Sequence, residues 1–198
     1  MMEKIHNTYR RIRDKVFTLL YRSSFKKLAS KSTLAMPFSV EGARFISIEK
    51  EVYIKPNAWL LAINDADYSS SETKLSIGEK TYIGRNAHIV ALQSIQIEKS
   101  VLMGDNVYIA DNFHRFERGE VPYKDQGVGF KSEVIIGEGT WLGENVCVIS
   151  SKIGKQCIVG ANSVVLHDIP DYSMAVGSPA KVIKTYNHES KKWVKIKS

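Results

Sequence analysis

The chain lacks the features of a secreted or membrane-spanning protein. It has two cysteines among 198 residues, Cys147 and Cys157, so it holds neither a disulfide framework nor a cysteine-based metal spacing. No apolar run approaches the ~18 residues of a membrane span. The stretch VFTLLY (16–21) is too short, and too basic at its flanks, for a signal peptide. We therefore expect a cytoplasmic protein.

Excess basic charge is absent from most of the chain. Residues 1–31 contain nine Lys or Arg against two acidic residues, which accounts for the whole net charge of +7. The rest of the chain is neutral, so we do not expect a nucleic-acid partner. With 43% hydrophobic and 25% charged residues, the composition is that of one globular domain with a small appendage.

The basic segment has the pattern of an amphipathic helix. Its apolar residues recur at helical spacings and form one stripe: Ile5, Tyr9, Ile12, Val16, Leu19 and Leu20. Basic residues line a neighbouring stripe: Lys4, Arg11, Lys15 and Arg22. We favour packing of the apolar stripe on the main domain or on another subunit. Peripheral contact with an anionic membrane, at its inner face, is the alternative.

From about Val40 the period changes to six residues, which neither a helix nor an ordinary strand explains. Seven of the thirteen glycines directly follow the repeating aliphatic residue. Each hexad is predicted to be a short strand and a tight corner, where glycine eases the backbone constraints, and three hexads close one triangular coil. The aliphatic residues are Ile48, Ile54, Leu60; Ile77, Ile83, Ile89, Ile95; Ile97, Met103, Ile109; Ile136, Leu142, Val148; and Ile153, Val159, Val165.

The repeat suggests three parts of the chain. Residues 1–39 form the basic helical segment, residues 40–184 the repeat domain, and residues 185–198 a basic C-terminal tail. The polar stretches 64–74 and 115–132 have no six-residue register, so we expect both to leave the prism as loops. Loops that project from a rigid scaffold often carry function, and the second begins directly after His114.

The repeat and several local motifs resemble the hexapeptide-repeat acyltransferases, over about residues 40–184. The motifs are MGDNVYIADNFH, WLG, VGANS and AVGSPAKVIK. They are most similar to the O-acetyltransferases of capsule, O-antigen and exopolysaccharide synthesis, and more distantly to maltose, galactoside and xenobiotic acetyltransferases. The resemblance implies an all-β solenoid, a left-handed parallel β-helix, that assembles as a homotrimer with active sites between subunits.

The resemblance also implies a catalytic base. His114 is the sixth residue of a hexad just ahead of a loop, where the family places this base. An imidazole can take the proton of a sugar hydroxyl as it attacks a thioester, and then return a proton to the thiolate. Asp111 matches the polysaccharide subgroup and would orient the imidazole or the sugar, although a turn aspartate bonding its own backbone is an equal alternative. A backbone N–H of a neighbouring coil would stabilise the oxyanion.

The family pattern implies acetyl-CoA as the co-substrate, held by the C-terminal coils. Trp141 would wall the channel, and the two lysines of the last motif would face the nucleotide phosphates. These side chains have simpler alternatives as interface packing and as solvated lysines. The implied binding residues are Trp141, Gly160, Ala161, Ser178, Lys181 and Lys184.

Three functions remain open from the sequence. The first is an acetyl-CoA-dependent O-acetyltransferase acting on a sugar hydroxyl in polysaccharide biosynthesis. The second is an N-acyltransferase acting on an amino-sugar nucleotide, and the third is a non-catalytic β-helix scaffold.

A zinc enzyme on this fold would need three converging histidines, and no histidine stands five positions after His114, so no metal is expected. His88 also ends a hexad, but no loop follows, so we expect it to be exposed or interfacial.

Overall fold

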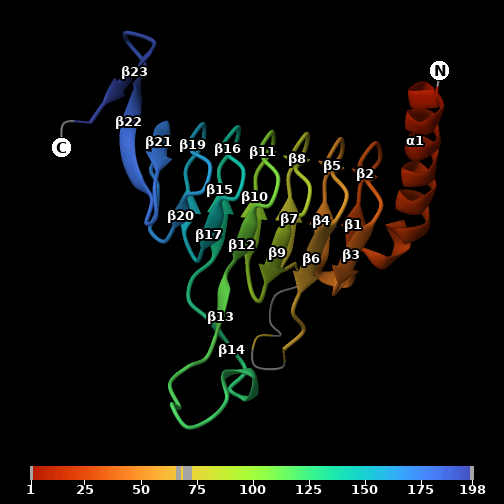
Figure 1. Cartoon of the computed structure of the whole chain (residues 1–198), viewed down its shortest axis with the longest axis horizontal. Coiled ribbons are helices and arrows are strands. Elements are labelled where there is room, and N and C mark those ends of the chain that lie inside the picture. The colour runs from red at the N-terminus through yellow and green to blue at the C-terminus, as the bar shows by residue number, and fades with distance from the viewer. Residues whose placement is uncertain (1, 66–67, 69–72, 197–198) are drawn as a thin grey trace.

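A computed structural model describes residues 2–65, 68 and 73–196 as a triangular prism of parallel strands with a helix at one end (Figure 1). The first sheet contains β1 (Lys27–Leu28), β4 (Ile46–Ile48), β7 (Leu75–Ile77), β10 (Ile95–Ile97), β15 (Val134–Ile136) and β18 (Lys152–Ile153). The second contains β2 (Thr33–Leu34), β5 (Tyr53–Ile54), β8 (Tyr82–Ile83), β11 (Leu102–Met103), β16 (Trp141–Leu142), β19 (Ile158–Val159), β21 (Ser173–Val176), β22 (Lys181–Asn187) and β23 (Lys192–Lys195). The third contains β3 (Phe38–Glu41), β6 (Ala58–Ala62), β9 (His88–Ala91), β12 (Tyr108–Ala110), β17 (Cys147–Ile149) and β20 (Val164–Val165).

The prism interior is the aliphatic column that the six-residue period predicts. In the first sheet Ile48 pairs with Ile77, Ile77 with Ile97, and Ile97 with Ile136. Each of these side chains is at most 1% exposed. Because equivalent residues stack directly on one another, every coil buries the same kind of side chain, and this repeated burial stabilises the solenoid.

The glycines at the corners have a different role from the predicted one. Gly104 and Gly143 do not need a left-handed backbone; instead, a Cβ on Gly143 would lie 2.6 Å from the backbone nitrogen of Ala161. The left-handed position lies two residues later and is held mainly by asparagine, as at Asn106 and Asn145. The corner glycines are therefore required by the close approach of successive coils.

The boundaries of the prism also differ from the sequence prediction. Its first coil begins at Lys27, before residue 40, because β1 pairs with β4 and β2 with β5. Residues 185–195 are not a free tail, since β22 pairs antiparallel with β21 and with β23. The loop predicted over residues 64–74 lies partly outside the described residues, and its last residue, Lys74, is buried.

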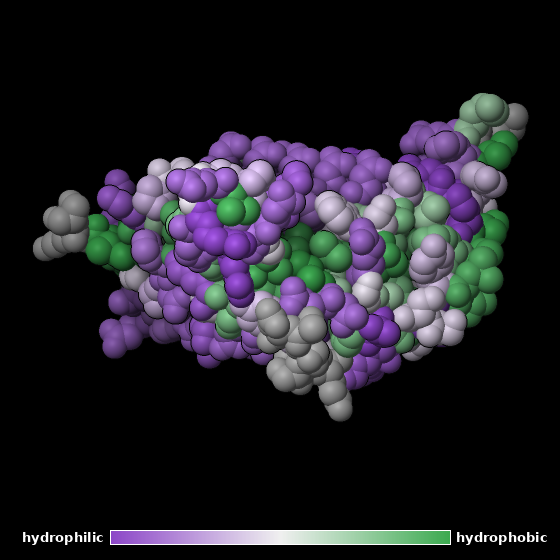
Figure 2. Space-filling model, turned by 90° about the horizontal axis from the view of Figure 1, so that it is seen from below, coloured by the Kyte–Doolittle hydropathy of each residue, from purple (hydrophilic) through white to green (hydrophobic). Residues whose placement is uncertain are grey.

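Helix α1 (Met2–Tyr21) lies across the N-terminal end of the prism and packs against β2 (Figure 1). Its buried residues are the polar Asp14 and Thr18, which hydrogen-bond the backbone of Met36 and Leu34. The predicted packing of the apolar stripe on the main domain is therefore wrong: the stripe faces away from the prism. Figure 2 shows hydrophobic surface at this end of the molecule. None of the helices in the described part of the chain has the length and hydrophobicity that a membrane span requires.

The second predicted loop is an ordered arm. It leaves the prism at Asn112, three residues earlier than expected, because β13 (Asn112–His114) pairs antiparallel with β14 (Val128–Phe130). Between these strands Gln126 ties the tip together by donating to the backbone oxygens of Arg118 and Val121. Short 3-10 turns occur at Arg22–Ser24, Ala43–Phe45 and Tyr123–Asp125.

Candidate active site

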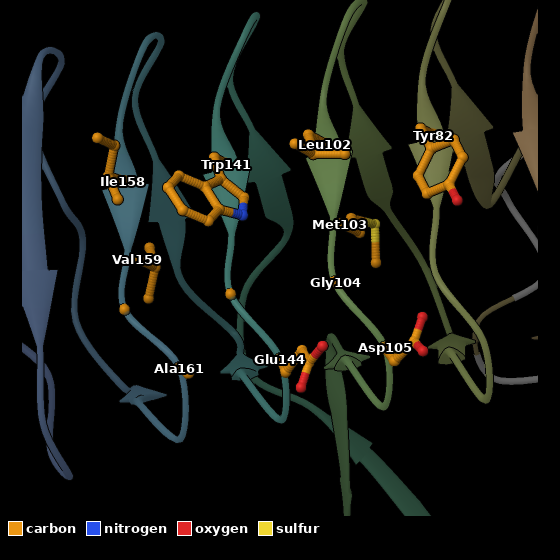
Figure 3. Close-up of a pocket in the computed structure, with 12 residues that line it drawn as sticks. Tyr82, Leu102, Met103, Gly104, Asp105, Trp141, Glu144, Ile158, Val159 and Ala161 are labelled. Atoms are coloured by element: carbon orange, nitrogen blue, oxygen red, sulfur yellow. The ribbon is translucent and has the colours of Figure 1, made fainter.

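A groove of about 500 Å³ runs along the outer face of the second sheet (Figure 3). The register of β8, β11, β16 and β19 places side chains in one row across successive coils: Tyr82, Leu102, Trp141 and Ile158. The corner between the second and third sheets forms the other wall, where Asp105, Glu144 and Ala161 lie (Figure 3). The groove thus has an apolar floor and a polar edge.

The groove collects half of the predicted cofactor residues. Trp141, Gly160 and Ala161 all line it, and the Trp141 side chain is 49% exposed. Sequence reasoning missed Tyr82, Leu102 and Ile158. They occupy the position directly before the inward aliphatic of their hexads, the same position as Trp141, and this shared register was the signal that could have found them.

The remaining predicted cofactor residues lie beyond the groove. Ser178 is exposed and follows β21, where its bond to Pro179 is cis. Lys181 and Lys184 are both on β22, which extends the second sheet past β21. The burial along β22 alternates, so Lys181 is exposed whereas Lys184 is half-buried. The two lysines therefore lie on opposite faces of β22. A phosphate bound at one face of the strand can contact only one of them.

His114 lies on the arm, in a hollow of about 390 Å³ that it forms with Phe116, Tyr123 and Lys124. The side chain is exposed at the end of β13, opposite Val128. The antiparallel pairing of β13 and β14 therefore fixes the backbone of His114 while leaving the imidazole accessible.

Asp111 is not placed as a partner of a substrate. It is completely buried, and its carboxylate accepts hydrogen bonds from the backbone N–H groups of Leu92, Gln93 and Ser94 at 2.7–2.8 Å. The Asn112 side chain donates a fourth bond at 3.0 Å. The alternative prediction, a turn aspartate that bonds backbone groups, describes Asp111 better. Its backbone partners, however, belong to the preceding coil and not to its own turn. It anchors the point where the arm departs.

The groove and His114 lie at different corners within one chain. The groove occupies the second sheet and its corner with the third, whereas the arm departs after β12, at the far edge of the third sheet. Among the described residues, none lines both hollows. One chain therefore does not bring the predicted base to the predicted cofactor groove.

Burial also shifts the pKa of titratable groups outside the two hollows, among them Lys74 and His88. Lys74 is 1% exposed and donates to the backbone oxygens of Ile63 (2.6 Å) and Tyr68 (3.1 Å). Burial lowers the pKa of its ammonium, although the nearby Asp111 and Asp65 favour the charged form.

His88 is half-buried on the third sheet, stacked on Trp59 at 4.3 Å and edge-on to Tyr108 at 5.3 Å. Burial lowers the pKa of the His88 imidazole. The side chain is thus enclosed by aromatic neighbours of its own sheet, less exposed than the sequence suggested.

The chain is similar to known acetyltransferases. Residues 133–167 match the family model described as the hexapeptide repeat of succinyl-transferase. A probable acetyltransferase of Mycobacterium tuberculosis is 38% identical over 153 residues, which cover 77% of this chain and 51% of that protein. The Escherichia coli protein WbbJ, whose name describes an O-acetyl transferase of lipopolysaccharide biosynthesis, is 39% identical over 115 residues, 54% of this chain and 59% of that protein. The chain thus spans between half and three fifths of the length of these relatives.

A solved structure shares the fold. AntD, an N-acyltransferase from Bacillus cereus in complex with dTDP and 3-hydroxybutyryl-CoA, has a TM-score of 0.71 at 18% identity, over 86% of this chain and 88% of that chain. At this identity the likeness concerns the fold. The six-residue repeat, the parallel prism and the match to the family model together show that the chain is a hexapeptide-repeat protein with a left-handed β-helix, similar to proteins named as acetyltransferases.

Proposed function

We propose that the protein is an acetyl-CoA-dependent O-acetyltransferase that acts on a sugar hydroxyl in polysaccharide biosynthesis. The observation that carries the proposal is the groove of the second sheet, which gathers Trp141, Gly160 and Ala161 from two coils. The name of the relative WbbJ, an O-acetyl transferase of lipopolysaccharide biosynthesis, supports a sugar hydroxyl as the acceptor.

The groove suits the pantetheine arm of acetyl-CoA. That arm is long, narrow and mostly apolar, with two amides, so it needs an extended apolar floor beside polar backbone. The row from Tyr82 to Ile158 provides the floor, and the corner around Gly143 and Gly160 provides backbone that no Cβ covers. Lys181, exposed just past the groove, is the lysine of the last motif that we assign to the nucleotide phosphates.

The transfer needs one base. His114 removes the proton of the sugar hydroxyl as the oxygen attacks the thioester carbonyl carbon. The tetrahedral intermediate then collapses, the carbon–sulfur bond breaks, and the imidazolium returns the proton to the departing CoA thiolate. The products are the sugar acetate and CoA, and no acyl-enzyme forms. Phe116 and Tyr123 beside His114 offer apolar and hydroxyl-bearing surface for a sugar ring.

The site is completed by a second subunit in this proposal. Because the groove and His114 lie at opposite edges of the third sheet, a cyclic assembly of parallel prisms is needed to bring the arm of one subunit to the groove of the next. A homotrimer, the assembly implied by the family resemblance, meets this requirement.

The reaction is tested by thiol release from acetyl-CoA against a panel of sugars, nucleotide sugars and oligosaccharides. At least one hydroxyl acceptor should stimulate release, and His114→Ala should lower the rate at least ~10²-fold without changing the assembly. His167→Ala is the matched control, because His167 is exposed and lies outside both hollows.

Two results would overturn the proposal. Stimulation by amino-sugar nucleotides alone would replace it with N-acyl transfer. Full activity of the His114→Ala protein would remove the base from the mechanism.

A further inference from the structure

The apolar stripe of α1 has no packing partner among the residues that the structure describes. It consists of Ile5, Tyr9, Ile12, Val16, Leu19 and Leu20, whose exposed fractions lie between 52% and 72%. A row of six such side chains along one helix face is far more than the scattered apolar residues of an ordinary surface. Hydrophobic surface also gathers at this end of the molecule in Figure 2.

The helix is held in this orientation by its polar face. The Thr18 hydroxyl accepts from the Leu34 N–H at 2.9 Å, and Asp14 accepts from the Met36 N–H at 3.1 Å. Arg13 pairs with Asp14 at 2.7 Å and also donates to the Met36 carbonyl at 3.0 Å. These bonds tie the polar side of α1 to the first coil, so the stripe is turned outward by specific contacts.

Basic side chains flank the outward stripe. Lys4, Arg11, Lys15 and Arg22 are all exposed, and in the part of the chain that the structure describes they form no ion pair. Beside the stripe a hollow of about 300 Å³ is lined by Lys15, Arg22 and Lys31, together with Leu19. The hollow has room and charge for an anionic headgroup next to an apolar side chain.

We infer that α1 docks the protein on the surface of a bilayer that contains anionic lipids. An in-plane helix inserts its apolar face into the headgroup and acyl boundary while flanking cations meet the lipid phosphates, and α1 presents both features on one side. A second copy fits less well, because two such stripes packed together would bring their basic flanks against each other. The inference goes beyond the proposed acyl transfer and does not depend on it.

The test is flotation of the full chain with vesicles of phosphatidylcholine alone or with about 30% phosphatidylglycerol. The wild type should float with the anionic vesicles and lose binding as salt is raised. Ile12→Asp with Val16→Asp should reduce the bound fraction at least about tenfold. Replacing Lys4, Arg11 and Lys15 by Gln should weaken binding at low salt.

The matched control removes the same charge at the other end of the prism, by replacing Lys191, Lys192 and Lys195 with Gln, and should bind as the wild type does. Failure of the wild type to float would overturn the inference, as would equal binding by the control and both α1 variants. If the wild type stays off the vesicles and the Asp variant forms smaller oligomers in light scattering, the stripe is a subunit interface instead.

Discussion

Asp111 shows how one buried side chain can couple two parts of this protein. A carboxylate without exposed surface is stable only when its oxygens are satisfied, and here backbone N–H groups of the preceding coil satisfy them. The same residue directly follows β12 and precedes the arm that carries His114. It is therefore a positioning residue, which holds the start of the arm against the prism.

The Asp111→Asn substitution tests this role. An amide keeps one acceptor oxygen and turns a donor toward backbone N–H groups, so the free energy of unfolding should fall by about 2 kcal/mol or more. Urea denaturation measures this loss. The exposed Asp125, which pairs with the exposed Lys124, is the matched control, and Asp125→Asn should change stability by less than about 0.5 kcal/mol. Unchanged stability with a large loss of activity would instead make Asp111 catalytic.

At the scale of elements, the regular coils were predictable and the departures from them were not. The six-residue period places equivalent residues in identical surroundings, so the buried column from Ile48 to Ile153 follows from the sequence alone. The arm departs earlier than its polar composition suggests, because Asn112–His114 finds its partner strand at Val128–Phe130. Long-range pairing of this kind leaves no local signal.

The candidate site also has a part that the sequence predicts and a part that it does not. Trp141, Gly160 and Ala161 were predictable from the resemblance to the acyltransferase family, whose motifs they match, and the groove collects them. The contacts of Asp111 and the orientation of α1 depend on backbone groups far away in the sequence, such as those of Ser94 and Met36. Helical spacing places the apolar stripe on one face, but it does not say which face the hydrogen bonds hold against the prism.

The buried Lys74, just before β7, makes the stability of the protein depend on pH, which can be tested. Burial lowers the pKa of Lys74 below its ordinary 10.5, so between the lowered value and 10.5 the unfolded chain binds more protons than the folded one. The free energy of unfolding should therefore rise with pH through this alkaline window, relative to Lys74→Met. Chemical denaturation of both proteins from about pH 7 to about pH 10 measures the difference. Lys191→Met changes an exposed lysine, so its free energy of unfolding should change with pH as that of the wild type does. If the difference in free energy of unfolding between the wild type and Lys74→Met stays constant with pH, the lowered pKa of Lys74 is contradicted.

At the scale of the whole molecule, the groove, the arm and the N-terminal helix lie on different sides of the prism. The groove follows the second sheet, the arm projects from the far edge of the third, and α1 covers one end (Figure 1). In the proposed trimer, a cyclic axis along the prism would join the groove of one subunit to the arm of its neighbour. The same symmetry would turn the apolar stripes of all subunits toward one end, so several helices could contact one membrane surface together.

Assemblies that mix two inactive variants test directly whether the active site is shared between subunits. Ala161→Trp fills the exposed edge of the groove, and His114→Ala removes the base, so each protein alone should fail to release thiol from acetyl-CoA in the presence of the acceptor. When the two chains are co-expressed in equal amounts, about one quarter of the interfaces in random trimers combine an intact groove with an intact His114. We predict that about this fraction of wild-type activity returns. Mixed trimers that remain inactive would contradict the shared site.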